Sequence, residues 1–285
     1  AEALRVSYDR RLTPARDDLA AEALRGRIDA PRYAAGVTYR VQAPVLGLRP
    51  RPDAEAALDT ELLLGEIFEV FEVADGWAWG QLATDDYVGY VDAAGLGQGP
   101  VPNAWIGARS AQLYRTPTLK SPPVTTLPWG AGLALTGRRE GSYAETDTGL
   151  WCDTRQIGLA ADDPVAVAEA WIGAPYLWGG RSVWGLDCSA LVQLAFWAVG
   201  HAVPRDTDMQ EAALPEVSGG LEGELRRGDL VFWRGHVGVL RDAETLLHAN
   251  AHHMQAVTEP LAKAVARIAA GETGPVTSVR RVLAA

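Results

Sequence analysis

One cysteine opens an apolar helical pattern in the C-terminal half of the chain. Cys188 stands just ahead of Leu191 and Leu194, whose spacing places them on one face of a helix, and Gly200 offers a stop signal. In the first turn of a helix, unpaired backbone N–H groups and the positive end of the helix dipole favour a thiolate over a thiol. A thiolate is a nucleophile, so the sequence predicts catalysis at Cys188. The alternative is that Cys188 is a small apolar residue at the start of a buried helix.

Two of the five histidines are placed to serve such a nucleophile. His236 begins one predicted strand, and His248 lies in the next predicted strand. With residues 241–243 as the hairpin loop, the two histidines are directly opposite each other, which places their Cβ atoms about 4.5–5.5 Å apart. We therefore predict that His236 takes and returns the proton of Cys188 and that His248 orients His236.

Other uses of these side chains are possible. Each histidine could be a hydrogen-bonded polar residue at the end of a strand. Cysteine and histidine also bind zinc, but a zinc site needs three or four ligands, and no third ligand accompanies Cys188, His236 and His248 at a typical spacing. His252 and His253 fall in a predicted loop, where we expect them to be solvated. We therefore expect neither a metal nor a cofactor.

The chain is long enough to build several domains around this site. Its 285 residues, of which 48% are hydrophobic, suffice for two or three domains. Residues 1–40 carry mixed charges and form either an arm that packs on a neighbouring domain or a solvated lead-in. Short alternating segments predict a small β-barrel over residues 41–98 and a second over residues 99–160, where Cys152 is expected to be a packed strand residue. Residues 161–285 combine the cysteine helix with the antiparallel strands of the histidines, which is an α+β arrangement.

Charge and cysteine content limit the partners and the compartment. The net charge is −10, from 36 acidic and 26 basic residues, so we expect neither nucleic acid nor an anionic membrane surface as a partner. Two cysteines build no disulfide framework, which is typical of a reducing compartment. No apolar run approaches the roughly 20 residues of a membrane-spanning helix, and the charged start of the chain lacks the apolar segment of a secretory signal. We expect a cytoplasmic monomer.

Six motifs, in the same order, resemble those of the NlpC-type peptidases of bacterial cell-wall metabolism, which are papain-like cysteine enzymes. They are APYLWGG at residues 174–180, DCS at 187–189, PRDTDMQ at 204–210, GDLVF at 228–232, HVG at 236–238 and HA at 248–249. The family often has glycine where this chain has Ala190, a residue that suits a helix better and leaves the chemistry unaffected. The short strands of residues 41–98 are similar to those of a bacterial SH3-type domain.

This resemblance implies a papain-like catalytic domain preceded by two small SH3-like β-barrels. It implies Cys188 as the nucleophile, His236 as the base and His248 as the third polar residue. Members of the family with two SH3-type domains cut murein peptides between γ-D-glutamate and the diamino acid. The implied activity is therefore that of a cysteine endopeptidase on short murein peptides, acting through a thioester acyl-enzyme.

The resemblance also implies residues that hold the substrate. Tyr176 would lend its hydroxyl to the oxyanion site. Asp187 would receive the free amino terminus of the substrate, an L-alanine, in a pocket that Ser189 and Thr207 line. These four residues lie within or beside the quoted motifs.

Glu66 and Tyr87, in the first predicted barrel, are further candidates for binding that ammonium, although each could be a solvated barrel residue. A first barrel pressed beside the cleft would exclude long glycan-linked chains, so the enzyme would act on liberated peptides, in recycling rather than in cutting the intact wall.

Two alternative functions are open. One is a thiol-dependent acyltransferase or deamidase that uses the same cysteine and histidine, and the other is a non-catalytic module that binds wall polymers.

Overall fold

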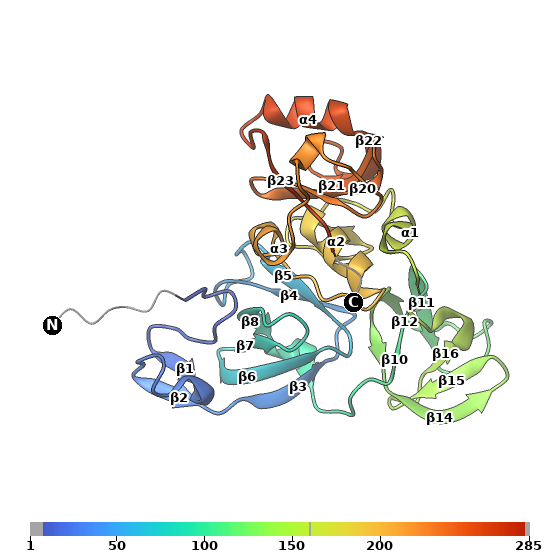
Figure 1. The fold of residues 1–285 in the computed structure, drawn as a ribbon. Helices are drawn as coiled ribbons and strands as arrows, with labels where there is room; N and C mark the ends of the chain where they lie inside the picture. The colour runs from blue at the N-terminus through green and yellow to red at the C-terminus, as the bar shows by residue number, and fades with distance from the viewer. Residues whose placement is uncertain (1–7, 160, 283–285) are drawn as a thin grey trace. The chain divides into compact units, whose positions relative to one another are not determined.

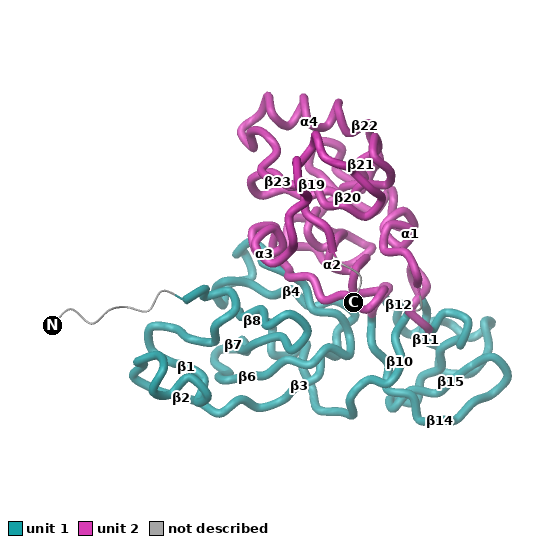
Figure 2. The backbone as a smooth tube through the Cα atoms, in the orientation of Figure 1, with its two compact units in different colours: residues 1–106, 111–127, 131–157 teal, residues 107–110, 128–130, 158–285 magenta. Residues whose placement is uncertain are grey.

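The computed structural model describes residues 8–159 and 161–282 (Figure 1). The chain divides into two compact units, which Figure 2 shows in different colours. Unit 1 consists of residues 1–106, 111–127 and 131–157, and unit 2 consists of residues 107–110, 128–130 and 158–285. The predicted arm and most of both predicted barrels thus share one unit, and the predicted α+β domain makes up most of the other.

The first barrel of unit 1 is built from short antiparallel strands, as the alternating sequence predicts. Its strands are β3 (Val37–Val41), β4 (Val45–Leu48), β5 (Thr60–Leu63), β6 (Ile67–Ala74), β7 (Trp77–Leu82), β8 (Val88–Asp92) and β9 (Leu96–Gly97). Five of them form one sheet in the order β8-β7-β6-β3-β9, and β4 pairs with β5. Both sheets contribute to one core, in which Leu48, Phe68 and Leu82 are fully buried. The first strand, β3, begins inside the predicted arm.

The second barrel of unit 1 repeats this arrangement. Its strands are β10 (Ala104–Trp105), β11 (Ser110–Tyr114), β12 (Pro123–Pro128), β13 (Gly132–Leu133), β14 (Leu135–Glu140), β15 (Tyr143–Thr146) and β16 (Trp151–Asp153). One sheet has the order β12-β11-β16-β15-β14, and β10 pairs with β13. Cys152 is fully buried in the core of this barrel, which confirms its prediction as a packed residue, and burial raises the pKa of its thiol to about 12. The two barrels touch where the Gly132 N–H donates to the Leu64 carbonyl at 2.7 Å.

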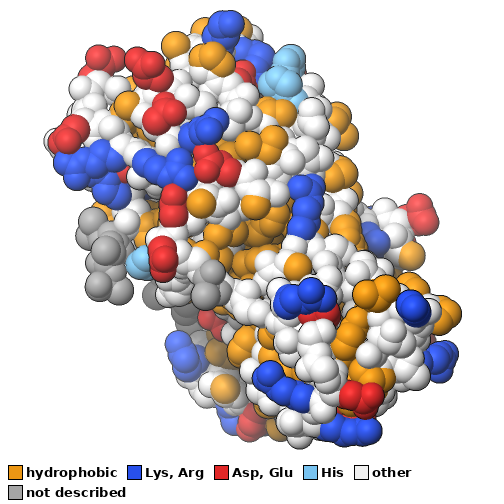
Figure 3. Space-filling model, turned by 90° about the vertical axis from the view of Figure 1, so that its right-hand side faces the viewer, with side chains coloured by type: hydrophobic (Ala, Val, Ile, Leu, Met, Phe, Trp, Pro, Cys, Tyr) orange, Lys and Arg blue, Asp and Glu red, His pale blue; other side chains and the backbone are white. Residues whose placement is uncertain are grey.

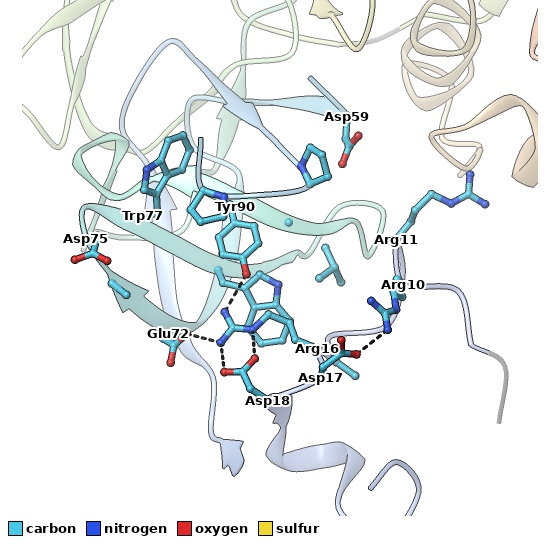
Figure 4. Close-up of a pocket in the computed structure, with 17 residues that line it drawn as sticks. Arg10, Arg11, Arg16, Asp17, Asp18, Asp59, Glu72, Asp75, Trp77 and Tyr90 are labelled. Atoms are coloured by element: carbon cyan, nitrogen blue, oxygen red, sulfur yellow. Dashed lines mark hydrogen bonds and ion pairs between the residues drawn. The ribbon is translucent and has the colours of Figure 1, made fainter. Parts of the chain in front are cut away.

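In the described part of the predicted arm, residues 8–36 pack against the first barrel through Arg16. The Arg16 guanidinium lies 4.6 Å from the ring centroid of Trp79 and forms ion pairs with Asp18 and Glu72. Figure 4 shows Arg16 next to Tyr90, within a cavity of about 730 Å³ that the arm and the barrel enclose together. The arm itself contains two short parallel strands and a 3-10 turn, which are β1 (Leu19–Ala21), β2 (Arg32–Ala34) and Glu22–Leu24.

Unit 2 is an α+β domain in which helices cover both faces of one antiparallel sheet, and this confirms the predicted fold class (Figure 1). The sheet has the order β22-β21-β20-β19-β23, with the bounds β19 (Leu230–Trp233), β20 (His236–Asp242), β21 (Thr245–Asn250), β22 (Gln255–Pro260) and β23 (Val276–Arg280). Its helices are α1 (Pro164–Glu169), α2 (Cys188–Trp197), α3 (Thr207–Ala213) and α4 (Leu261–Ala269). Leu230 and Phe232 pack in the core that contains α2, whereas Val231 and Trp233 pack in the core that contains α4. This alternation follows from the two-residue period of a strand.

The surface mixes charges of both signs. Figure 3 shows basic and acidic side chains interspersed over the face that it draws, so the acidic excess is not gathered into one patch there. Within the described part of the chain, no helix combines the length and the apolar character needed to cross a bilayer.

Candidate active site

Helix α2 begins at Cys188 because Asp187 caps it. The Asp187 Oδ1 accepts a hydrogen bond of 2.8 Å from the backbone N–H of Ala190, which is the pattern of an N-cap residue. Every residue from Cys188 to Phe196 is buried, so α2 forms the centre of the core beside the sheet. Cys188 lies in the first turn, as predicted, with 6% of its surface exposed.

The surroundings of the Cys188 sulfur favour the thiol over the thiolate. Burial raises the pKa of the thiol to about 12, and the nearby carboxylate of Asp187 adds to the effect. A backbone hydrogen bond from Val237 and the positive charge of Arg205 lower the pKa but are weaker. Desolvation thus opposes the effect predicted for the start of the helix, and a resting thiolate at Cys188 stays a prediction.

His236 and His248 contact each other through their rings, as predicted. The His236 Nε2 lies 2.8 Å from the His248 Nδ1, and the ring centroids are 5.1 Å apart. His248 is fully buried, whereas His236 is half-buried at the start of β20. Val237, the next residue, makes a backbone hydrogen bond with the sulfur of Cys188. The start of β20 therefore lies at the N-terminus of α2.

The pairing of β20 with β21 differs by two residues from the predicted one. Leu240 pairs with Leu246, and Gly238 lies against His248, where a Cβ would be 3.1 Å from the histidine Cβ. A bulge after Leu240 and a turn shorter than predicted account for the difference. His236 and His248 are therefore diagonal partners on one face of the sheet, rather than directly opposite each other.

Burial keeps both histidines neutral. It lowers the pKa of His236 to about 3, with a further contribution from the charge of His248. It also lowers the pKa of His248 to about 4, although a bonded carboxylate opposes the shift. A neutral imidazole keeps one ring nitrogen without hydrogen, and this nitrogen can accept a proton.

The bonded carboxylate belongs to Glu259, which sequence reasoning missed. The His248 Nε2 lies 2.8 Å from the Glu259 Oε1, and Arg267 in α4 pairs with the same oxygen. Glu259 reaches His248 because β22 pairs with β21 so that Val257 faces His248, and Glu259 is two residues further on the same face. The signal in the sequence would have been a strand over Gln255–Pro260, directly after the histidine strand.

The carboxylate of Asp187 is fully engaged inside the domain. Its Oδ1 accepts from the Ser189 hydroxyl at 3.0 Å, the Ala190 N–H at 2.8 Å and the Arg205 Nη1 at 3.0 Å. Its Oδ2 accepts from the Gly179 N–H at 3.1 Å and the Arg205 Nη2 at 2.7 Å. Five donors fill a carboxylate that offers about four lone-pair sites. The structure therefore gives Asp187 a capping and pairing role and Ser189 a place in the same network. The predicted contact of Asp187 with a substrate ammonium stays a prediction.

Tyr176 packs against the core cluster that contains Cys188. Its backbone N–H donates to the Met254 carbonyl at 3.0 Å, and it bridges to Leu186 just before the cysteine helix. Burial raises the pKa of the phenol, and the neighbouring Cys188 and Asp187 raise it further. The phenol is therefore protonated at neutral pH and able to donate a hydrogen bond to an oxyanion. Its role in catalysis stays a prediction.

The segment after α2 is attached to the start of that helix. The Gln210 amide donates to the Ser189 carbonyl at 3.0 Å and to the Pro204 carbonyl at 2.8 Å. Arg205, whose side chain is fully buried, forms the ion pair with Asp187. Thr207 is the half-buried first residue of α3, and its predicted place in a substrate pocket stays a prediction.

Glu66 and Tyr87 belong to unit 1, whereas the cysteine belongs to unit 2. The Glu66 carboxylate accepts hydrogen bonds of 2.7 Å from the Leu63 N–H and from the Thr84 hydroxyl. Tyr87 is part of the core of the first barrel, with 3% of its surface exposed. Both side chains thus have contacts within the barrel, and their role in substrate binding stays a prediction.

Three potential metal ligands lie together behind the histidine pair. One ligand atom each of His248, His253 and Glu259 lies within 4.8 Å of the others. Glu259 already accepts from His248 and from the Arg267 guanidinium, and the His253 Nδ1 is 3.0 Å from the Asn250 Oδ1. A cation would have to displace that guanidinium, so these side chains fit a hydrogen-bonded network better than a metal centre.

Two parts of the chain match known families. Residues 173–267 match the NlpC/P60 family, and residues 48–96 match the family described as the bacterial dipeptidyl-peptidase Sh3 domain. Dipeptidyl-peptidase 6 of Lysinibacillus sphaericus is 27% identical over 243 residues, which cover 74% of this chain and 86% of that protein. The probable endopeptidase NlpC homolog of Haemophilus influenzae is 34% identical over 125 residues, which cover 41% of this chain and 67% of that protein.

A further relative and a solved structure complete the comparison. The gamma-D-glutamyl-L-lysine dipeptidyl-peptidase of Bacillus subtilis is 34% identical over 97 residues, which cover 31% of this chain and 32% of that protein. The crystal structure of an NlpC/P60 family protein from Bacillus cereus has a TM-score of 0.74 at 19% identity and covers 87% of this chain and 100% of that one. At that identity the likeness concerns the fold. The matches in sequence and fold therefore place this chain in the NlpC/P60 family of peptidoglycan endopeptidases, as a cysteine peptidase with a bacterial SH3 domain ahead of its papain-like domain.

Proposed function

We propose that the chain hydrolyses the bond between γ-D-glutamate and the diamino acid in short murein peptides that have a free N-terminal L-alanine. The observations that carry the proposal are the 2.8 Å contact of His236 with His248 and the backbone hydrogen bond from Val237, the residue after His236, to the buried Cys188 at the start of α2. The choice of bond is supported by relatives that are named dipeptidyl-peptidase and gamma-D-glutamyl-L-lysine dipeptidyl-peptidase.

The proposed reaction uses Cys188 as nucleophile and His236 as base. The His236 Nε2 faces His248, so its Nδ1 is the nitrogen left to serve the sulfur. As the sulfur attacks the γ-carbonyl carbon, the thiol proton passes to His236 and then to the leaving nitrogen of the diamino acid, and the C–N bond breaks. Water next attacks the thioester and gives a proton to His236, which returns it to the departing sulfur.

Two donors are proposed for the oxyanion that forms during attack. The backbone N–H of Cys188 is in the first turn of α2, where such groups have no partner within the helix. The protonated hydroxyl of Tyr176 is the second donor, since burial raises the pKa of this phenol. In comparable sites the loss of one donor lowers kcat by about 10²–10³.

We extend the proposal to liberated peptides, as in recycling, and to a cytoplasmic setting. A net charge of −10 repels anionic wall polymers, so a small soluble peptide is the easier substrate. Cys152 and Cys188 are both free thiols, which suits a reducing compartment.

The test is product analysis by mass spectrometry on a small panel of peptides. The panel holds L-alanyl-γ-D-glutamyl-L-lysine, the same peptide with meso-diaminopimelate, and N-acetylated forms of both. We expect the dipeptide and a diamino acid with a new amino group, with a strong preference for the unblocked forms. Ammonia or an acylated acceptor would instead identify a deamidase or acyltransferase, and binding of purified sacculi without any hydrolysis would identify a wall-binding module.

A further inference from the structure

Glu259, His248 and His236 form a row of three hydrogen-bonded side chains, and the carboxylate of Glu259 is at its end. The Glu259 Oε1 lies 2.8 Å from the His248 Nε2, and the His248 Nδ1 lies 2.8 Å from the His236 Nε2. The side chain of His248 is fully buried and that of Glu259 is 14% exposed, so water competes little for these contacts. Each ring nitrogen of His248 therefore has one protein partner.

The carboxylate determines which nitrogen of each ring carries the hydrogen. An ionised carboxylate only accepts hydrogen bonds, so His248 must donate to Glu259 from Nε2. A neutral His248 then has a lone pair on Nδ1, which accepts the hydrogen on the His236 Nε2. The Nδ1 of His236 is left with a lone pair, which is the form that a proton acceptor requires.

Arg267 keeps Glu259 ionised. Its guanidinium donates to the same Oε1 that faces His248. Burial alone would raise the pKa of Glu259, but the hydrogen bonds from His248 and Arg267 outweigh it and lower the pKa. Helix α4, which carries Arg267, packs on the sheet through Leu261 and Ala264. Helix α4, which lies on the opposite face of the sheet from α2, therefore supports the histidine pair through Arg267 and Glu259.

We propose that Glu259 is a positioning residue that, through His248, holds His236 in the tautomer whose Nδ1 is free to take the proton of Cys188. The expected effect on catalysis rests on the proposed function, whereas the assignment of the histidine tautomers does not. Glu259 touches no reacting atom in this scheme and acts only through His248.

The experiment compares Glu259→Ala and Glu259→Gln with the matched control Glu244→Gln in the full chain. Glu244 is an exposed carboxylate in the turn before β21, outside the histidine row. Histidine side-chain ¹H–¹⁵N spectra at neutral pH report the tautomers, and kcat and KM for the unblocked tripeptide report catalysis. Thermal unfolding of each variant checks that it folds.

We expect Glu259→Ala to lower kcat about tenfold to a hundredfold with little change in KM, and to release His248 and His236 from their single tautomers. Glu259→Gln keeps an acceptor oxygen, so it should retain the tautomers and most of the activity, and Glu244→Gln should match the wild type. Unchanged tautomers in Glu259→Ala, or equal losses in the Ala and Gln variants, would overturn the proposal. If the wild type cleaves no murein peptide, the proposed function is wrong. The histidine spectra and the rate at which iodoacetamide alkylates Cys188 still test whether Glu259 fixes the tautomers.

Discussion

The burial of Cys188 and His236 disfavours the charged form of each, so we expect their ion pair to form only as the reaction proceeds. Burial raises the pKa of the thiol to about 12 and lowers that of the imidazole to about 3. Proton transfer from sulfur to nitrogen is therefore uphill on its own and has to be coupled to the attack on the carbonyl.

The raised pKa of the Cys188 thiol predicts how the rate of its alkylation depends on pH. In a Cys152→Ala background, the rate at which iodoacetamide labels Cys188 should keep rising with pH above 9.0, the ordinary value for a thiol, because the thiolate forms only at higher pH. Rates measured by intact mass at a series of pH values check this. A rate that levels off near neutral pH would show a resting thiolate and contradict the burial argument.

Substitution of His236 should lower kcat/KM more than substitution of His248. His236→Ala removes the base and should lower kcat/KM by about 10²–10⁴. His248→Gln should cost less, because a glutamine carbonyl can still accept from the His236 Nε2 and its amide can donate to Glu259. Steady-state kinetics of both variants check the order, and a larger loss for His248→Gln would reject this division of roles.

The nucleophile and the histidine pair could be predicted from the sequence, whereas the pairing of Asp187 with Arg205 could not. Cys188, His236 and His248 stand in motifs whose spacing fixes a helix start and two neighbouring strands. The buried partner of Asp187 is Arg205, which lies 18 residues away and binds through the tertiary fold. Local sequence does not show that a carboxylate is already paired.

At the level of the elements, the start of α2 depends on one buried ion pair. Arg205→Met would leave the Asp187 carboxylate without its cation in a buried position, which typically costs about 3–5 kcal/mol of unfolding free energy. Arg226→Met, which breaks an exposed pair with Glu224, should change stability very little. Urea unfolding of both variants measures the difference, and equal effects would contradict the importance of the buried pair.

The strands of unit 2 show where sequence patterns stop being sufficient. The two strands predicted around His236 and His248 are β20 and β21 in the structure. Their exact pairing depends on a bulge after Leu240, which no local pattern marks. Strand β22 is absent from the predicted strands, and the role of Glu259 near its end was missed with it.

For the whole molecule, the three predicted domains and the arm correspond to two compact units. The alternation of apolar and polar residues predicts each barrel separately. The hydrogen bond between Gly132 and Leu64 that joins the barrels is made by backbone groups, so no side-chain pattern predicts it. Glu66 and Tyr87 are candidates because of their place in the first predicted barrel. The structure shows a hydrogen bond of Glu66 and core packing of Tyr87 within that barrel.

The two cysteines of the chain provide the most direct test of the central claim, since one is in each unit. Cys188→Ala and Cys152→Ala should be assayed with L-alanyl-γ-D-glutamyl-L-lysine by mass spectrometry, after thermal unfolding has shown that both fold. We predict that Cys188→Ala releases no lysine, while Cys152→Ala, in the core of the second barrel, cleaves like the wild type whenever it remains folded. Hydrolysis by purified, folded Cys188→Ala would contradict the account.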